Sequence, residues 1–164
     1  MLDEFEEFFE YRNGKLYWKK QKRGRGKVGE EVGGSISRHG YRRMMFNYKE
    51  YNICRIIFYL HHKIWPEYVD HINGDKLDDR IENLRAADRY QNQANTSRRV
   101  NNKTGYKGVI EDKRTGKFMA KLMNKNKLYS LGSYNTAEEA AMAYDKKAIE
   151  LQGEFARLNL ELDV

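Results

Sequence analysis

Two segments of the chain, residues 1–10 and residues 52–62, repeat apolar residues at the i, i+3, i+4 spacing of an amphipathic helix. The positions that carry this spacing are Leu2, Phe5, Phe8, Phe9, Ile53, Ile56, Ile57 and Leu60. The first segment is acidic between its apolar positions, so we expect a short helix that covers an N-terminal sheet. The second segment is more apolar, and we expect its helix to belong to a core.

Other segments predict strands. The N-terminal half holds two of them, residues 15–20 after an Asn13-Gly14 turn and residues 41–48 before a turn at Lys49-Glu50. The C-terminal half holds three, joined by polar turns, at residues 106–111, 117–123 and 127–134. These patterns predict an α+β fold with a small antiparallel sheet in the first half and a three-stranded antiparallel sheet in the second.

A helix is expected to pack on the second sheet. Thr136 opens a Thr-Ala-Glu-Glu sequence, a capping box in which Thr136 caps the helix and Glu139 reaches back. Alanines dominate one side of the helix and let it lie close to the sheet, and Gly153 ends it. Residues 95–103 are polar, basic and poor in apolar side chains, which makes them the best linker between the halves.

The stretch with the most candidate catalytic and metal-binding side chains is residues 67–96, with the sequence EYVDHINGDKLDDRIENLRAADRYQNQANT. An Asn73-Gly74 turn lies between two extended segments, and residues 87–95 are a plausible helix. This order predicts a strand, a loop, a strand and a helix arranged around one cation.

Four side chains of this stretch match the needs of phosphodiester hydrolysis. Asp70 and Asn92 offer hard oxygen ligands, which suit Mg²⁺ or Mn²⁺ better than zinc. His71 is the natural general base, and Asn83 could bond backbone groups of the loop and pin the histidine. The alternative is a polar hairpin with capping Asn and Asp residues and an exposed histidine.

The same stretch resembles the HNH endonuclease family, whose fold is the ββα-metal motif, in the subgroup typical of phage and intron-associated homing endonucleases. The resemblance implies that Asp70 and Asn92 are metal ligands, His71 is the general base and Asn83 is the structural asparagine. Asn92 replaces the histidine that usually ends the motif. Cys54 stands where such proteins often have a histidine, and we expect it to be a buried, small apolar side chain.

The composition favours a polyanionic partner. The net charge is +7, the sequence pI is near 9.3, the mean hydropathy is −0.94 and 34% of the residues are charged. With Cys54 as the single cysteine, the chain forms no internal disulfide and no cysteine-based zinc finger, which is typical of a reducing cytoplasm. No apolar run approaches the length of a membrane span.

Basic residues cluster in two polar segments. Residues 21–34 are rich in glycine and place Lys22, Arg23, Arg25 and Lys27 where they could lie against phosphates. Arg98 and Arg99 in the linker are candidates for the same contact. A solvated loop is the alternative for residues 21–34.

Residues 103–159 are similar to the Apetala-two, or ethylene-response-factor, DNA-binding domain. The phrases that carry the similarity are YKGV, TGKFMAKL and LGSYNTAEEAAMAYDKKAIELQGEFARLN. The resemblance implies that the sheet reads double-stranded DNA while the helix supports it from behind. The candidate DNA contacts that it implies are Lys107, Arg114, Lys117, Lys121 and Lys127.

Together these observations predict a homing-type DNA endonuclease with an HNH nuclease module at residues 1–97, a linker at 98–102 and a DNA-binding domain at 103–160. We expect a monomer that binds double-stranded DNA in the cytoplasm, in a host cell if the gene is phage-borne, and needs no small molecule beyond the metal. Two alternatives stay open, a non-catalytic DNA-binding regulator with a decayed nuclease fold and an RNA-binding accessory protein.

Overall fold

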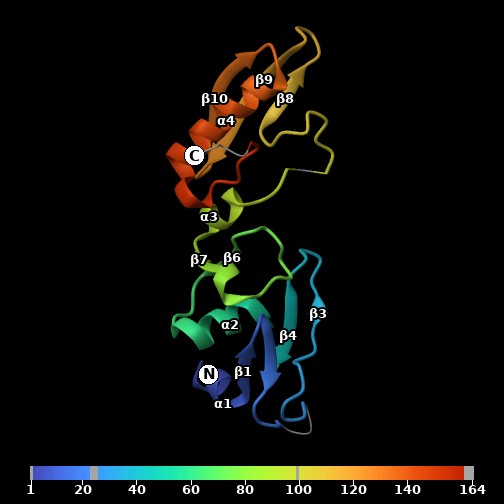
Figure 1. Ribbon diagram of the computed structural model, residues 1–164, viewed down its shortest axis with the longest axis vertical. Helices are drawn as coiled ribbons and strands as arrows, with labels where there is room; N and C mark the ends of the chain where they lie inside the picture. The colour runs from blue at the N-terminus through green and yellow to red at the C-terminus, as the bar shows by residue number, and fades with distance from the viewer. Residues whose placement is uncertain (1, 23–25, 99, 161–164) are drawn as a thin grey trace. The chain divides into compact units, whose positions relative to one another are not determined.

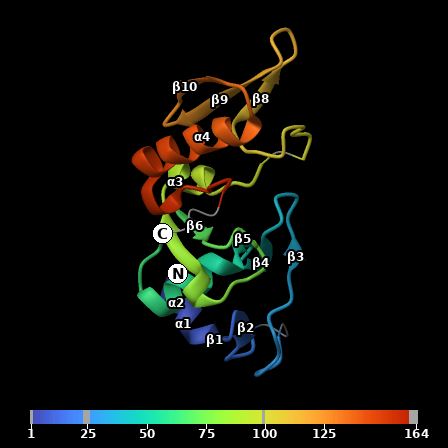
Figure 2. The same cartoon turned by 45° about the horizontal axis from the view of Figure 1, so that its top comes forward.

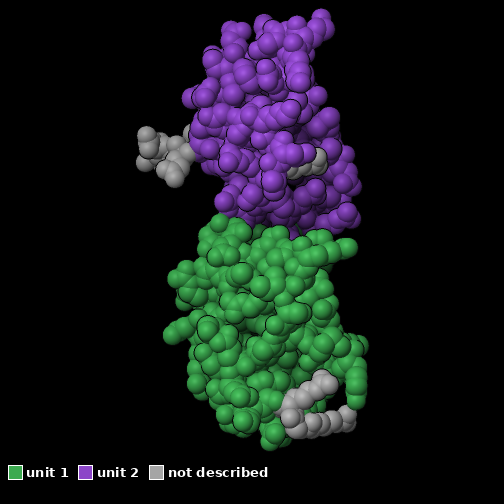
Figure 3. Space-filling view, turned by 90° about the vertical axis from the view of Figure 1, so that its right-hand side faces the viewer, with its two compact units in different colours: residues 1–88 green, residues 89–164 purple. Residues whose placement is uncertain are grey.

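The computed structural model describes residues 2–22, 26–98 and 100–160 of the 164-residue chain. The chain divides into two compact units, residues 1–88 and residues 89–164 (Figure 3). The linker expected at residues 98–102 therefore lies inside the second unit. Among the described residues, none of the helices has the length and apolar character needed to cross a membrane.

The described residues of the first unit form two helices, a 3₁₀ turn and three small antiparallel sheets, β1-β2, β3-β4-β5 and β6-β7 (Figure 1). Its elements in chain order are α1 (Leu2–Phe8), β1 (Phe9–Arg12), β2 (Lys15–Trp18), β3 (Ser35–Ile36), β4 (Arg42–Phe46), β5 (Lys49–Asn52), α2 (Ile53–His62), β6 (Tyr68–His71), η1 (Ile81–Asn83) and β7 (Leu84–Ala87).

Helix α2 is the centre of this unit, because it contacts strands from all three sheets. Ile56 and Ile57, on the apolar stripe predicted from the sequence, are fully buried. Phe5 of α1 is also fully buried and lies beside Phe9, Phe46 and other aromatic rings. The expected core helix and the amphipathic first helix are therefore both present.

The end of one helix and the position of one turn differ from the expectation. The first helix ends at Phe8 rather than near residue 10, because Phe9 already pairs with Trp18 in the β1-β2 hairpin. The turn after β4 lies at Asn47 and Tyr48, whose φ angles of 49° and 62° are left-handed, and Lys49 already belongs to the returning strand. Consecutive left-handed residues form the tight turn that suits the twist of a two-residue hairpin.

The second unit consists of a three-stranded antiparallel sheet covered on one face by a long helix (Figures 1 and 2). Its elements in chain order are α3 (Arg89–Ala94), β8 (Val109–Asp112), β9 (Lys117–Asn124), β10 (Lys127–Tyr134), α4 (Ala137–Gln152) and η2 (Gly153–Phe155).

Small side chains allow α4 to approach the sheet closely. Ala140, Ala141 and Ala148 are fully buried against it, and the capping box predicted at Thr136 is present with both of its hydrogen bonds. The first strand begins at Val109 rather than at residue 106. Gly108 has a φ of +75°, and a Cβ there would lie 2.3 Å from the Tyr144 ring, so the chain bends at this glycine before it enters the sheet.

Candidate functional site

The hairpin β6-β7 positions the acidic residue expected to bind a metal. Asp70 pairs with Arg85 across the two strands, and the residue is only 3% exposed. The guanidinium of Arg85 donates to Asp70 Oδ2 from Nε and from a terminal nitrogen, each at 2.8 Å. A charge-assisted pair of this kind fixes the orientation of a buried carboxylate.

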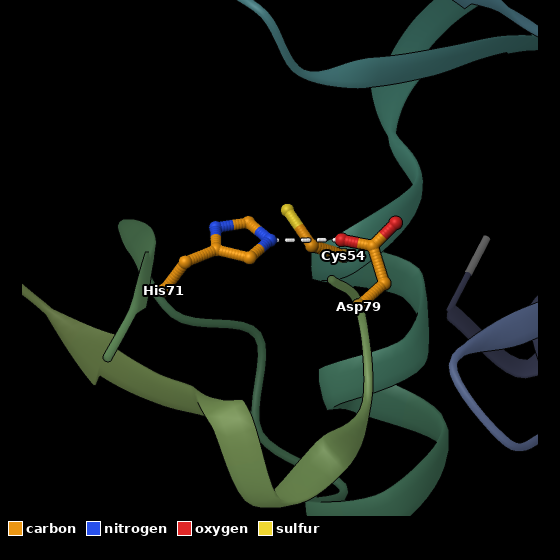
Figure 4. A group of neighbouring side chains, drawn as sticks. All are labelled: Cys54, His71 and Asp79. Atoms are coloured by element: carbon orange, nitrogen blue, oxygen red, sulfur yellow. Dashed lines mark hydrogen bonds and ion pairs between the residues drawn. The ribbon is translucent and has the colours of Figure 1, made fainter. Parts of the chain in front are cut away.

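His71 follows Asp70 at the last position of β6 and forms a buried pair with Asp79. The His71 Nε2 lies 2.9 Å from Asp79 Oδ1, and the two residues are 3% and 2% exposed (Figure 4). Asp79 Oδ2 faces the guanidinium of Arg42, whose Nε is 3.6 Å away. The imidazole is therefore held by a carboxylate that has a cation on its other side.

The sequence did not single out Asp79. The available signal was a pair of acidic residues, Asp78 and Asp79, shortly after the turn. Only Asp79 turns inward, whereas Asp78 pairs with exposed Arg80, which lowers the Asp78 pKa to about 2. Adjacent residues of a loop carry no periodicity that would have distinguished the two.

Asn83 ties the loop that follows His71 into one conformation. Its Oδ1 accepts a hydrogen bond from the Asn73 backbone N–H at 2.9 Å. Its Nδ2 donates to Asn73 Oδ1 at 3.0 Å and to the Asp78 backbone carbonyl at 2.8 Å. These bonds close the loop that carries Asp79 and bring it back to the end of the hairpin.

Cys54, in the first turn of α2, is the third chemically active side chain beside His71. It is buried, as expected, and burial raises the pKa of its thiol to about 12. One ligand atom each of Cys54, His71 and Asp79 lies within 4.8 Å of the other two (Figure 4). From the sequence we expected a buried, small apolar side chain at this position, where similar proteins often have a histidine, and no local pattern indicated the proximity to His71 and Asp79.

Asn92 lies on α3, within the helix expected at residues 87–95. The structure places it in the second unit, whereas Asp70 and His71 belong to the first.

Comparisons with known proteins agree with the two resemblances found in the sequence, to HNH endonucleases and to the Apetala-two DNA-binding domain. A family model described as HNH endonuclease matches residues 53–94, and an AP2 domain model matches residues 104–154. Protein 3.8 of Escherichia phage T7 is 32% identical over 90 residues, which are 55% of this chain and 74% of that protein. The uncharacterized HNH endonuclease L560 of Acanthamoeba polyphaga mimivirus is 36% identical over 92 residues. The chain contains an HNH endonuclease domain at residues 53–94 and an AP2 domain at residues 104–154.

The similarity to other relatives is limited to parts of their length. The 92 residues matched to L560 are 56% of this chain and 46% of that protein. The ethylene-responsive transcription factor WRI1 of Arabidopsis thaliana is 42% identical over 59 residues, which are 35% of this chain and 14% of the plant protein. No solved structure gives a significant match.

The HNH match contains Cys54, Asp70, His71, Asp79, Asn83 and Arg85, and it also contains Asn92 of α3, whereas Arg42 precedes it. The AP2 match covers β8, β9, β10 and α4, the sheet and helix of the second unit. The HNH part of the chain therefore supplies the buried pair of His71 and Asp79, and the AP2 part supplies the sheet expected to face DNA.

The cations expected to contact DNA differ in their exposure. Lys27, Arg98, Arg114, Lys117 and Lys127 are exposed, and Lys121 is half-buried. Arg98 also donates to the Gly105 backbone carbonyl. Arg23, Arg25 and Arg99 lie outside the described residues.

Lys107 has a different environment from the other candidates. Its Nζ donates to the Ala94 backbone carbonyl at 2.5 Å, and burial lowers its pKa to about 8. The neighbouring Arg157 adds to this lowering, and Asp145 opposes it. The Lys107 ammonium is thus directed into the second unit, and we do not include it among the proposed DNA contacts.

Proposed function

We propose that this chain is a site-specific, metal-dependent DNA endonuclease of the homing type. In this proposal residues 1–97 are the nuclease module with the ββα-metal arrangement, residues 98–102 are a linker and residues 103–160 read the target. The observation that carries the proposal is the buried pair of His71 and Asp79 next to Asp70, at the end of the β6-β7 hairpin.

His71 is the proposed general base. An ionised carboxylate only accepts hydrogen bonds, so Asp79 places the ring proton of His71 on Nε2 and leaves the lone pair on Nδ1. Nδ1 takes a proton from a water molecule while the water oxygen bonds to the scissile phosphorus and the bond to the 3′ oxygen breaks. Asp79 stabilises the imidazolium that forms, as the carboxylate does in hydrolytic triads.

Asp70 and Asn92 are the proposed ligands of the metal. One carboxylate and one amide oxygen form a hard donor set, which fits Mg²⁺ or Mn²⁺. A divalent ion bound there supplies positive charge for the phosphate and the departing oxygen. Arg85 orients the Asp70 carboxylate, and Asn83 holds the loop that returns to His71.

Basic side chains of both units supply affinity for the backbone of double-stranded DNA. The proposed contacts are Arg23, Arg25, Lys27, Arg98, Arg99, Arg114, Lys117, Lys121 and Lys127. Each phosphate that such a cation neutralises releases counterions, so binding weakens steeply as salt rises. Sequence reading is assigned to the sheet of the AP2 domain.

Cleavage of supercoiled DNA that carries candidate target sites tests this function. We expect nicked or linear product with Mg²⁺ or Mn²⁺ and none with EDTA. With one active centre per chain, a monomer forms the nicked circle first. Salt-sensitive DNA binding without cleavage in any metal would instead support the non-catalytic regulator, a candidate favoured by Asn92 at the position where the motif usually ends in histidine.

A further inference from the structure

Cys54, His71 and Asp79 come from three different segments and meet at one buried point. Cys54 lies in the first turn of α2, His71 ends β6 and Asp79 lies in the loop before η1 (Figure 4). None of the three is more than 3% exposed. We propose that their thiolate sulfur, imidazole nitrogen and carboxylate oxygen form a second metal site, selective for Zn²⁺, whose occupation blocks the general base.

The donor set distinguishes this site from the proposed Mg²⁺ site. Thiolate sulfur and imidazole nitrogen are ligands that Zn²⁺ accepts and that Mg²⁺, which demands oxygen, does not favour. Three protein ligands with a fourth position for water or another small ligand are typical of zinc sites that are not purely structural. A carboxylate and a thiolate together also balance the two charges of the ion.

The distances require only small adjustments. With zinc bond lengths of about 2.0 Å to nitrogen or oxygen and about 2.3 Å to sulfur, tetrahedral ligand atoms lie about 3.3 to 3.5 Å apart. The His71 nitrogen and the Asp79 oxygen are now 2.9 Å apart, and all three ligand atoms lie within 4.8 Å of one another. Arg42 faces the other oxygen, Oδ2, so Asp79 Oδ1 is the atom offered to the metal.

Binding at this point rearranges the protons of His71. Zn²⁺ bonds to the Nε2 lone pair, so the single proton of the neutral ring moves from Nε2 to Nδ1. The Cys54 thiol loses its proton to solvent, and one proton is released for each ion bound. Nδ1 then carries a hydrogen and has no lone pair for a water proton. This blocking step rests on the proposed role of His71 as the base, whereas binding of the metal does not depend on it.

Spectroscopy of the full chain tests the binding without reference to cleavage. Cys54 is the only cysteine, so a thiolate-to-metal charge-transfer band on addition of Co²⁺ reports this side chain alone. We expect the band to saturate at one equivalent, to disappear on addition of Zn²⁺ and to be absent in Cys54→Ala. Asp70→Ala is the matched control and keeps the band. Co²⁺ binding without a thiolate band would overturn the site.

The strength of binding gives a second measurement. Loss of an outer-shell partner already weakens metal binding 10–100-fold, so we expect about 100-fold or more weaker Zn²⁺ binding in Cys54→Ala, measured against a chromophoric chelator. Asp79→Asn should also weaken binding. Equal affinities in the wild type and both variants would overturn the assignment even if the Cys54 variant changed the packing of α2.

Cleavage in excess Mg²⁺ tests the blocking step. We expect stoichiometric Zn²⁺ to stop cleavage by the wild type and to leave Cys54→Ala active. Equal inhibition of the two proteins would overturn the blocking step. An absence of cleavage before any Zn²⁺ is added would count against the proposed function, while the Co²⁺ band would still decide whether the metal site exists.

Discussion

The imidazole of His71 and the carboxylate of Asp79, eight positions apart in the sequence, form a hydrogen bond of 2.9 Å that is almost completely shielded from solvent. A carboxylate in such an environment fixes both the orientation and the tautomer of its histidine. The pair therefore holds the His71 ring in one orientation at the end of β6.

Replacement of His71 by alanine removes the proposed base and leaves the phosphate-binding cations in place. We expect His71→Ala to lose detectable cleavage while its affinity for DNA at fixed salt stays within about twofold of the wild type, because phosphate contacts supply most of the binding. Cleavage and gel-shift assays on one plasmid check both results. His61→Ala, an exposed histidine of α2, is the control and should cut normally. Wild-type cleavage by His71→Ala would remove His71 from the mechanism.

Replacement of Asp79 by asparagine keeps the size of the side chain and removes its charge. We expect the rate of cleavage to fall about 10²- to 10⁴-fold with little change in the DNA concentration needed for half-maximal rate, as for the corresponding carboxylate of hydrolytic triads. Single-turnover cleavage over a range of DNA concentrations separates the two quantities. Asp75→Asn changes an acidic side chain in the same loop that is exposed, and it should have little effect on the rate. Equal losses in the two variants would indicate a general disturbance of the loop.

Replacement of Asn83 by alanine removes three hydrogen bonds from the loop between β6 and β7. Because Asn83 is 8% exposed, its loop partners lose bonds that water replaces poorly, and we expect a loss of about 1–3 kcal/mol in the free energy of unfolding. Urea denaturation followed by the fluorescence of Trp18 and Trp65, which both belong to the first unit, measures this loss. Asn101→Ala, an exposed asparagine of the second unit, should leave the same transition unchanged. A loss no larger than that of the control would mean that the loop holds its conformation without Asn83.

Local patterns in the sequence predicted most of the elements, because each depends on residues close together in the chain. The apolar stripe of α2 and the capping box at Thr136 are examples, and both are present. The tight turn at Asn47 and Tyr48 was misplaced by two residues, since asparagine and tyrosine signal a left-handed turn less clearly than Asn-Gly does.

The components of the site that the sequence did not reveal depend on contacts between distant segments. Cys54 and Asp79 are 25 positions apart, and only the packing of α2 against the loop before η1 brings them to His71. The environment of Lys107 was not predicted for the same reason. From the sequence we expected a cation that contacts DNA, but its ammonium donates to the Ala94 carbonyl. No periodicity in the sequence encodes these tertiary contacts.

The part-buried ammonium of Lys107 makes the stability of the second unit depend on pH. Burial lowers the Lys107 pKa from an ordinary value of 10.5 to about 8 in the folded chain. Between these values the unfolded chain binds more protons than the folded chain, so this residue makes the free energy of unfolding rise with pH. Below pH 8 the lysine is charged in both states, and the penalty for burying the charge is fully present.

Lys107→Met should remove this pH dependence while keeping an unbranched side chain that is one heavy atom shorter. We expect the variant to be more stable than the wild type at pH 7 and to lose that advantage by pH 10.5. The difference between their free energies of unfolding should change by about 1–3 kcal/mol over this range. Urea denaturation at several pH values, followed by the methyl signals of buried Ala120 and Ala148, reports on this unit. Because other lysines and tyrosines titrate in both proteins, their contributions cancel in the difference. Lys113 is exposed, so the difference in free energy of unfolding between Lys113→Met and the wild type should not vary with pH. If the corresponding difference for Lys107→Met also does not vary with pH, the Lys107 ammonium is well solvated in the folded chain.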